Sequence, residues 1–117
     1  MSDPKPSKRY RASQAEWSGI YEAFKGAGCR ICEEYPIELH HVLPRSHSGD
    51  DVIVNLVPLC RVCHARVEAR DPVARAALRE SFSEAHIAYL RFRLGERAEA
   101  WLDRNYFVNA IRLEEVA

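Results

Sequence analysis

Four cysteines arranged in two pairs constrain the fold of this 117-residue chain more than any other feature. The pairs are Cys29-Arg-Ile-Cys32 and Cys60-Arg-Val-Cys63, and they contain every cysteine of the chain. Two thiolates separated by two residues can bind one ion, and two such pairs complete a closed tetrahedral shell. Thiolates select soft or borderline metals, so we expect structural Zn²⁺ at Cys29, Cys32, Cys60 and Cys63. Two disulfides, an iron centre or a redox pair are the alternatives.

A closed four-sulfur site has no open coordination position, so we expect this zinc to stabilise the fold rather than to perform chemistry. It would join two segments that are distant in the sequence. Structural zinc sites of this kind contribute on the order of 10 kcal/mol to folding. A small domain can therefore depend on such a site for its stability.

Composition predicts a single globular domain. Hydrophobic residues make up 47% of the chain and charged residues 29%, which argues against wholesale disorder. Every apolar run is shorter than the roughly 18 residues of a membrane span, because charges or prolines interrupt it. The first residues also lack the apolar centre of a signal peptide. We therefore expect a cytoplasmic protein that does not contact membranes.

The charges are unevenly distributed although the formal net charge is zero. The polar segment 1–12 contains Lys5, Lys8, Arg9 and Arg11 against Asp3, which predicts a flexible basic arm. Such an arm suits contact with phosphates, although charge runs also occur on ordinary solvated surfaces.

Periodicity, capping residues and turn residues predict helices around two short extended segments. Ser13 and Glu16 form a capping-box pattern that opens the first helix, and Asp71-Pro72 and Ser83 open later ones. The expected elements are a helix from 13 to a stop at Gly26 and Gly28, strands 37–43 and 56–59, and a loop 44–51. Helical structure is expected from His64 to Arg70, and further helices from 72 onward, at 83–94 and at 96–105.

A second set of polar residues lies between and after the cysteine pairs. It comprises His40-His41 before Pro44-Arg45-Ser46, then Asn55-Leu56, then Cys60-Arg-Val-Cys63-His64. In this order the segment 29–68 resembles the HNH endonuclease family, and most closely its small four-cysteine members from bacteriophages and bacteria. Several independent elements agree, which makes the resemblance specific.

The resemblance implies an α+β fold with a ββα-metal (HNH) core, stapled by the four-cysteine zinc site and surrounded by helices. Residues 13–117 would form one HNH endonuclease domain, with a motif core at 29–68 and C-terminal helices at 72–105. The implied activity is metal-dependent hydrolysis of phosphodiester bonds in duplex DNA, by nicking or cutting. Phage members often act with the terminase that packages DNA, so a terminase partner and a bacterial or phage-infected cell are further expectations.

The resemblance also assigns roles to individual residues. His40 and His64 match ligands of one catalytic divalent cation, and His41 matches the general base. Asn55 matches the residue that pins the loop of the base and orients its ring. Glu68 lies four residues after His64, on the same helical face. It could ligate a hard cation or hold water, so Mg²⁺, Mn²⁺ or another transition ion fits.

Three further residues, Arg45, His47 and His86, have expected roles outside the metal site. Arg45 is the expected DNA-binding residue, because a guanidinium can hold two phosphate oxygens. His47 is expected to be solvated in its polar loop, and His86 to be structural.

Two other functions compete with the nuclease. A non-catalytic zinc-ribbon DNA-binding module would need only the four cysteines and the basic arm. A restriction-type enzyme acting on modified DNA would need an additional recognition domain. The intact set of His40, His41, Asn55 and His64 favours a nuclease, and we expect low intrinsic sequence specificity.

Overall fold

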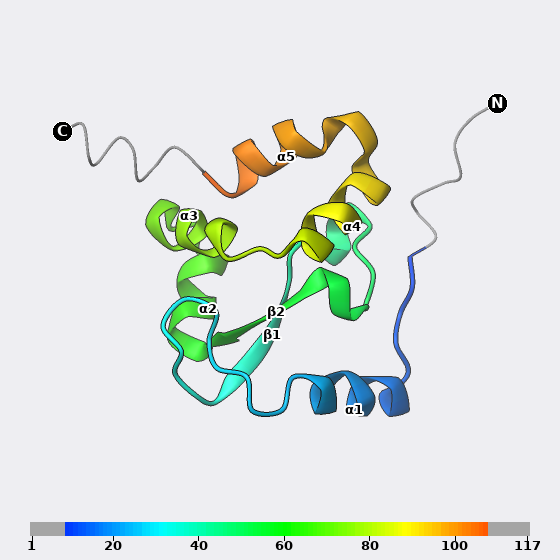
Figure 1. Cartoon of the computed structure of the whole chain (residues 1–117), viewed down its shortest axis with the longest axis vertical. Helices are drawn as coiled ribbons and strands as arrows, with labels where there is room; N and C mark the ends of the chain where they lie inside the picture. Colours follow the sequence, from blue (N-terminus) through cyan, green and yellow to red (C-terminus); the bar gives the residue numbers. More distant parts are fainter. Residues whose placement is uncertain (1–8, 108–117) are drawn as a thin grey trace.

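A computed structural model describes residues 9–107. Helices surround a two-stranded sheet near the middle of this part of the chain (Figure 1). The α-helices and strands are α1 (Gln14–Ala23), β1 (Ile37–His41), β2 (Leu56–Cys60), α2 (Arg61–Glu68), α3 (Pro72–Glu80), α4 (Glu84–Leu94) and α5 (Ala98–Asn105). Short 3₁₀ turns η1 (Arg45–His47), η2 (Ile53–Asn55) and η3 (Gly95–Arg97) connect some of them. The expected α+β class, with a ββα order at its centre, is confirmed.

Local capping signals place three helix starts where the sequence predicted them. Ser13 and Glu16 make the complete capping box of α1. The carboxylate of Asp71 accepts from Ala74 N at the start of α3, and Pro72 occupies the first turn. Ser83 caps α4, with His86 in place of the usual acidic residue. Such caps depend on residues only three positions apart, so they can be recognised without tertiary information.

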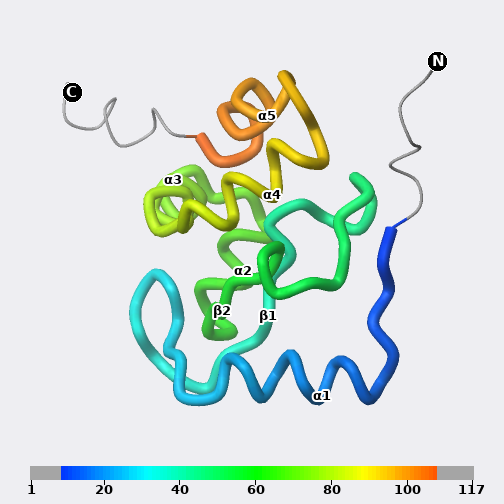
Figure 2. Tube along the Cα trace, turned by 45° about the vertical axis from the view of Figure 1, so that its right-hand side comes forward, coloured from blue at the N-terminus to red at the C-terminus, as the bar shows by residue number. Residues whose placement is uncertain are grey.

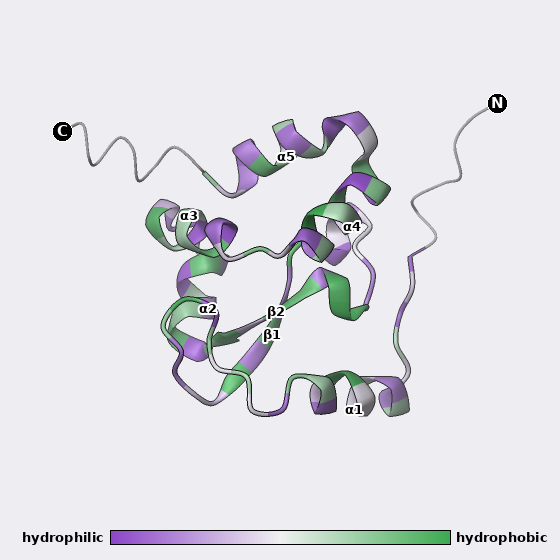
Figure 3. Ribbon diagram, in the orientation of Figure 1, coloured by the Kyte–Doolittle hydropathy of each residue, from purple (hydrophilic) through white to green (hydrophobic). Residues whose placement is uncertain are grey.

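The two strands pair antiparallel, with Glu38 opposite Leu59 and His40 opposite Val57. All five residues of β2 are buried, and Figure 3 shows its mostly apolar colouring. The expected strand 37–43 was too long, because β1 ends at His41. Val42 N still donates to Asn55 O at 2.8 Å, but the chain turns away before Pro44, which cannot continue a ladder.

The helix after β2 begins earlier than predicted. We expected the chain to be helical from His64 onwards, whereas α2 begins at Arg61 and the sulfur of Cys60 accepts from Cys63 N at its N-terminus. A thiolate can act as a cap, a role that propensity rules assign to Ser, Thr, Asp or Asn. His64 and Glu68 therefore both lie within α2, one turn apart.

The C-terminal helices cover the core on one side of the sheet. Leu78 of α3, Leu90 of α4 and Leu102 of α5 are fully buried together with Val57 and Leu59 of β2. In two views, α1 and α5 lie at opposite ends of the molecule, with the strands and α2 between them (Figures 1 and 2). Over residues 9–107, no helix has both the length and the apolarity that crossing a bilayer would need.

The expected flexible arm covered residues 1–12, of which residues 1–8 lie outside the described part. Residues 10–12 pair with the loop before η2. Tyr10 N donates to the Asp50 carboxylate at 2.6 Å and Ala12 N to the Asp51 carboxylate at 3.0 Å. Asp51 N donates back to Tyr10 O at 2.9 Å. Residues 10–12 are therefore held against this loop and do not belong to a flexible arm.

His86 connects α4 to the sheet, in line with its expected structural role. It is 5% exposed, its Nε2 lies 3.0 Å from Leu56 O, and its Nδ1 accepts from Ser83 N at 3.0 Å. These contacts require Nε2 to carry the hydrogen of a neutral ring. Burial lowers the pKa of His86, and this outweighs the opposite influence of the Leu56 carbonyl.

We predict that His86 makes the fold sensitive to mild acid. Because its pKa is lower in the folded chain, the unfolded chain binds more protons below the ordinary histidine pKa of about 6.5. Stability is therefore lost as the pH falls through that region. His86→Gln should lower the unfolding free energy at neutral pH but reduce its loss on acidification. Denaturant titrations from about pH 7.5 to pH 5 would measure this, with the exposed His47→Gln as control. The prediction would be contradicted if the unfolding free energy of wild type and of His86→Gln decreased equally as the pH falls.

Candidate functional site

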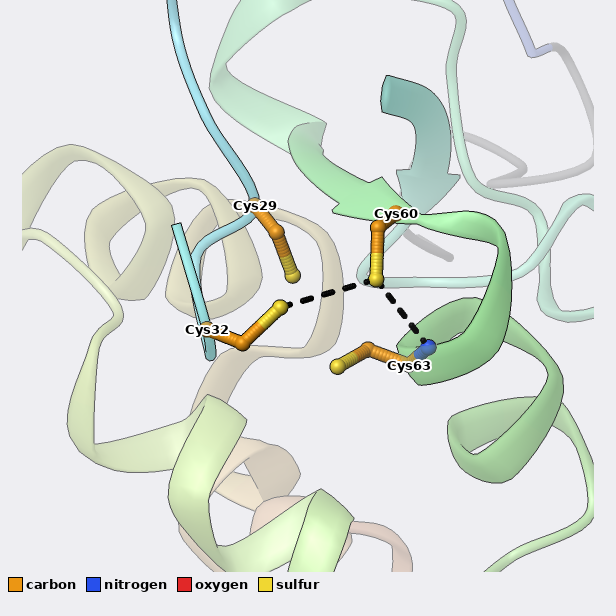
Figure 4. A group of neighbouring side chains, drawn as sticks. All are labelled: Cys29, Cys32, Cys60 and Cys63. Atoms are coloured by element: carbon orange, nitrogen blue, oxygen red, sulfur yellow. Dashed lines mark hydrogen bonds between the residues drawn. The ribbon is translucent and has the colours of Figure 1, made fainter. Parts of the chain in front are cut away.

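The four cysteines converge on one point, as their spacing predicted. Their sulfur atoms all lie within 4.8 Å of one another, and Cys32 Sγ is 3.6 Å from Cys60 Sγ. Tetrahedral Zn²⁺ with bonds of about 2.3 Å would place sulfur atoms about 3.8 Å apart. Figure 4 shows one pair entering from a loop and the other from the junction of β2 and α2. The donor set and its dimensions fit a zinc ion.

The close packing of these thiols shifts their pKa values in opposite directions. Burial raises the pKa of Cys63, and the three neighbouring thiols raise it further. Burial acts in the same direction on Cys29, but backbone N–H groups of Cys60, Cys32 and Ile31 lower the pKa of Cys29 to about 6. Four thiolates this close repel one another, and a divalent cation among them removes that repulsion.

A second group of possible metal ligands consists of His40, His64 and Glu68. One ligand atom from each lies within 4.8 Å of the others. His40 lies on β1, whereas His64 and Glu68 lie one turn apart on α2. Because β2 pairs antiparallel with β1 and α2 begins directly after β2, the helix packs next to β1. Glu68, whose role the sequence left open, is thus placed beside both histidines.

His64 is oriented by a carboxylate on its outer side. Its Nδ1 lies 2.7 Å from Glu38 Oε1, and Arg61 Nε donates to the same carboxylate at 3.2 Å. Hydrogen bonds from His64 and then Arg61 lower the pKa of Glu38. An ionised Glu38 accepts the Nδ1–H, so Nε2 of neutral His64 is left as an acceptor, 3.6 Å from Glu68 Oε2. Metal-bound histidines commonly have such an outer carboxylate.

His40 lies deeper than His64, with 4% of its surface exposed. Its Nδ1 is 3.1 Å from Glu68 Oε2 and its Nε2 is 3.1 Å from the Tyr106 hydroxyl. Burial lowers the pKa of His40 although the Glu68 carboxylate opposes this. The hydrogen bond with His40 in turn lowers the pKa of Glu68. Two neutral imidazoles and one carboxylate suit Mn²⁺ or another transition ion, and the carboxylate also suits Mg²⁺.

His41 contacts a different partner from His40, as expected for neighbouring residues of a strand. Its Nε2 lies 2.9 Å from Asp51 Oδ1. Asp51 also accepts two hydrogen bonds from Arg45, at 3.1 and 2.9 Å, and one from Arg11 at 3.1 Å. Burial raises the pKa of Asp51, but hydrogen bonds led by Arg45 and His41 outweigh it, so the net shift is downward. The Asp51 carboxylate thereby holds His41.

Asn55 holds the loop that follows His41. It is fully buried; its Oδ1 accepts from Leu43 N at 2.8 Å, and its Nδ2 donates to Leu43 O and Asp50 O, both at 3.0 Å. Gly49 lies in the same loop, where a Cβ atom would overlap the Leu43 carbonyl. The sequence predicted that Asn55 pins this loop, and its contacts are with backbone rather than with the His41 ring.

These side chains share one cleft with a volume of about 470 Å³. Its lining includes His40, His41, Arg45, His64 and Glu68, together with Arg75 and Tyr106 from the C-terminal part of the chain. Exposed His47 is not among the lining residues. The cleft thus places the expected metal ligands, the expected base and an arginine around one solvent-accessible space.

Four contributors to this site are not among the site residues predicted from the sequence: Glu38, Asp51, Arg75 and Tyr106. Glu38 could have been found, because it lies two residues before His40 and hence on the same strand face. Asp51 lies in a polar loop beside a second aspartate, and no other sequence feature marked it as a site residue. Arg75 and Tyr106 reach the cleft only through the packing of helices that are distant in sequence.

We predict that Cys29→Ser or Cys60→Ser removes the metal and most of the folded structure. The loss of about 10 kcal/mol from a structural zinc site would exceed the usual stability of a small domain. Elemental analysis and circular dichroism of the purified variants would measure this, with Ser46→Ala on the exposed turn as control. A folded wild-type protein without bound metal would contradict it.

Comparison with known proteins identifies the segment that contains this site. The model of the family described as HNH endonuclease matches residues 28–70, which is less than half of the chain. No curated protein and no solved structure matches the chain. The matched residues include both cysteine pairs, both strands and α2. Residues 28–70 therefore match the HNH endonuclease family, which is the family that the sequence motifs indicated.

Proposed function

We propose that this protein is a metal-dependent endonuclease that hydrolyses phosphodiester bonds of duplex DNA. The observation that supports this most strongly is the convergence of His40, His64 and Glu68 within 4.8 Å, in a cleft also lined by His41. Metal-assisted hydrolysis needs a cation site, a base and room for a phosphate in one place. The family match at residues 28–70 supports nuclease chemistry.

In this mechanism, His40 Nδ1, His64 Nε2 and a Glu68 oxygen would hold one divalent cation. When bound, the cation would draw charge from a phosphate oxygen and stabilise the developing negative charge of the transition state. Glu38 fixes the His64 ring from outside the cleft, which keeps Nε2 directed at the ligand position. The four-cysteine cluster stays separate and holds the start of α2 in place.

His41 is the general base. Its Nε2–H donates to Asp51, so Nδ1 carries the lone pair that can accept a proton from the attacking water. The Asp51 carboxylate stabilises the imidazolium that forms. Asp51 stays ionised because Arg45 and Arg11 contact it. Asn55 acts indirectly, through the backbone of the loop that contains Pro44 and Arg45.

Arg45 is proposed to contact the DNA phosphate at the edge of the cleft. About half of its side chain is exposed, and it lines the cleft beside His41. It contacts Asp51 as well, so a bound phosphate would share this guanidinium with the carboxylate. Contacts of this type do not depend on base identity, which supports low intrinsic specificity.

We predict different defects for the two kinds of histidine. His41→Ala removes the base but no ligand, so DNA cleavage should fall by roughly 10²–10⁴-fold while cation affinity is kept. His64→Ala removes a ligand, so cation affinity itself should fall and excess cation should restore part of the activity. Supercoiled-plasmid nicking with Mg²⁺, Mn²⁺ or other divalent ions, next to calorimetric cation titration, would measure both.

His47→Ala is the matched control for this experiment, because His47 lies on the same loop but outside the cleft. Zinc bound to the cysteines should be retained in all three variants. Equal nicking by wild type and His41→Ala would refute the assigned base. Absence of nicking with every cation, combined with retained DNA binding, would favour the alternative of a non-catalytic zinc-ribbon module.

We also predict that cleavage tolerates many DNA sequences and weakens steeply with salt. Phosphate contacts release counterions, so affinity falls as salt rises from about 50 to 200 mM. Nicking rates on plasmids of unrelated sequence, measured across this range, would test it. Activity restricted to one short sequence and insensitive to salt would contradict the proposed mode of binding. A terminase partner remains an expectation from the family resemblance.

A further inference from the structure

Tyr106 reaches the cleft from outside the segment that matches the family. It follows α5, is 1% exposed, and packs its ring against Phe82 and Trp101 at centroid distances of 5.1 and 5.9 Å. The guanidinium of Arg75 lies 5.1 Å from the centre of the same ring. The ring therefore has a fixed position, and its hydroxyl is directed at β1.

Arg75 fixes this position from a second direction. Its Nε donates to Val67 O at 2.8 Å and its Nη1 to Asn105 O at 2.7 Å. It thereby joins α2, which contributes His64 and Glu68, to the backbone immediately before Tyr106. The tyrosine is thus placed relative to the helix that bears two of the three proposed ligands.

The Tyr106 hydroxyl has two neighbours but only one hydrogen. It lies 2.7 Å from Val42 O and 3.1 Å from His40 Nε2. A carbonyl oxygen can only accept, so the hydroxyl must donate to Val42 O if that contact is a hydrogen bond. The contact with His40 is then a hydrogen bond only if Nε2 carries the hydrogen and donates to the hydroxyl oxygen.

The direction of this hydrogen bond determines whether Nδ1 of His40, which faces Glu68, is a donor or an acceptor. With the hydrogen on Nε2, Nδ1 of the neutral ring has the free lone pair, 3.1 Å from Glu68 Oε2. Two acceptors at that distance repel each other, and a cation bound to both would remove the repulsion. In the other tautomer Nδ1–H would satisfy Glu68, but the single hydroxyl hydrogen could not serve both Val42 O and Nε2. With a cation bound at Nδ1 and Glu68, the Nε2–H tautomer gives Nδ1, Nε2 and Val42 O a partner each.

We propose that Tyr106 is a positioning residue that sets the tautomer of His40, so that Nδ1 is available to the divalent cation. This inference rests on the metal site proposed above. Tyr106 serves His40 as Glu38 serves His64, by occupying the outer ring nitrogen. The difference is that Glu38 lies within the HNH segment, whereas Tyr106 is supplied by the C-terminal helices.

Tyr106→Phe tests this, because it removes the hydroxyl but keeps the ring that packs against Phe82, Trp101 and Arg75. Removing the hydrogen-bond partner of a metal ligand typically weakens metal binding by 10–100-fold. We expect a loss of Mn²⁺ affinity in this range by calorimetric titration. Zinc content should not change. Tyr89→Phe is the matched control: Tyr89 is another buried tyrosine, whose hydroxyl donates to Asp50 at 2.6 Å, so its loss should cost stability but not Mn²⁺ affinity.

The ¹⁵N chemical shifts of the His40 ring provide a readout that is independent of metal and of activity. In wild-type protein with zinc in the cysteine site and no second cation, Nδ1–H donating to Glu68 competes with Nε2–H donating to Tyr106, and we expect a measurable Nε2–H population at pH 8. Tyr106→Phe should shift the population toward Nδ1–H. A wild-type ring with no Nε2–H population would overturn the inference, and this measurement does not require the variant to fold.

The outcomes separate this inference from the proposed function. If wild type binds no Mn²⁺ but its His40 shows the Nε2–H tautomer that Tyr106→Phe reverses, the metal site fails and the role of Tyr106 in the tautomer stands. If wild type binds Mn²⁺ and Tyr106→Phe binds it equally, with the same tautomer, the inference fails while the metal site stands. An equal loss of Mn²⁺ affinity in Tyr89→Phe would also refute the assigned role, because it would show that general destabilisation is sufficient.

Discussion

Convergence of four cysteine sulfurs is the constraint on which the rest of the structure depends. The cluster joins the loop 29–32 to the end of β2 and the start of α2, where the Cys60 sulfur also caps the helix. The Arg30 backbone N–H donates to Pro58 O at 2.8 Å, so the same loop also pairs with β2. Since α2 carries His64 and Glu68, a metal that holds its first turn also sets the distance from these side chains to His40.

A second set of buried polar contacts shapes the loop between the strands. Asn55 bonds the backbone at Leu43 and Asp50, and Asp51 gathers hydrogen bonds from His41, Arg45 and Arg11. Buried polar groups of this kind are costly unless they are fully paired. Pairing these groups specifies one conformation of the loop. The proposed base, His41, directly precedes this loop and contacts Asp51 within it. The loop that the sequence describes only as polar is therefore rigidly connected to the site.

The two proposed metal-binding histidines illustrate one physical rule with different residues. Each neutral imidazole has one donor and one acceptor nitrogen, so the partner of the outer nitrogen decides which atom can bind a cation. A carboxylate performs this role for His64 and a tyrosine hydroxyl for His40. The buried histidine has the uncharged partner, which avoids placing a further charge in the least solvated part of the cleft.

Features that depend on short spacings can be recognised in the amino-acid sequence alone. These include the two cysteine pairs, the capping of α1, α3 and α4, the α+β class, and the order of His40, His41, Asn55 and His64. The start of α2 at Arg61, the pairing of Asp51 with His41 and the contact of Tyr106 with His40 appear only in the folded chain. Caps and cysteine pairs involve residues three or four positions apart, and so leave a pattern in the chain. The contact between Tyr106 and His40 spans 66 positions, and it forms only because burying α3, α4 and α5 against the sheet brings the two residues together.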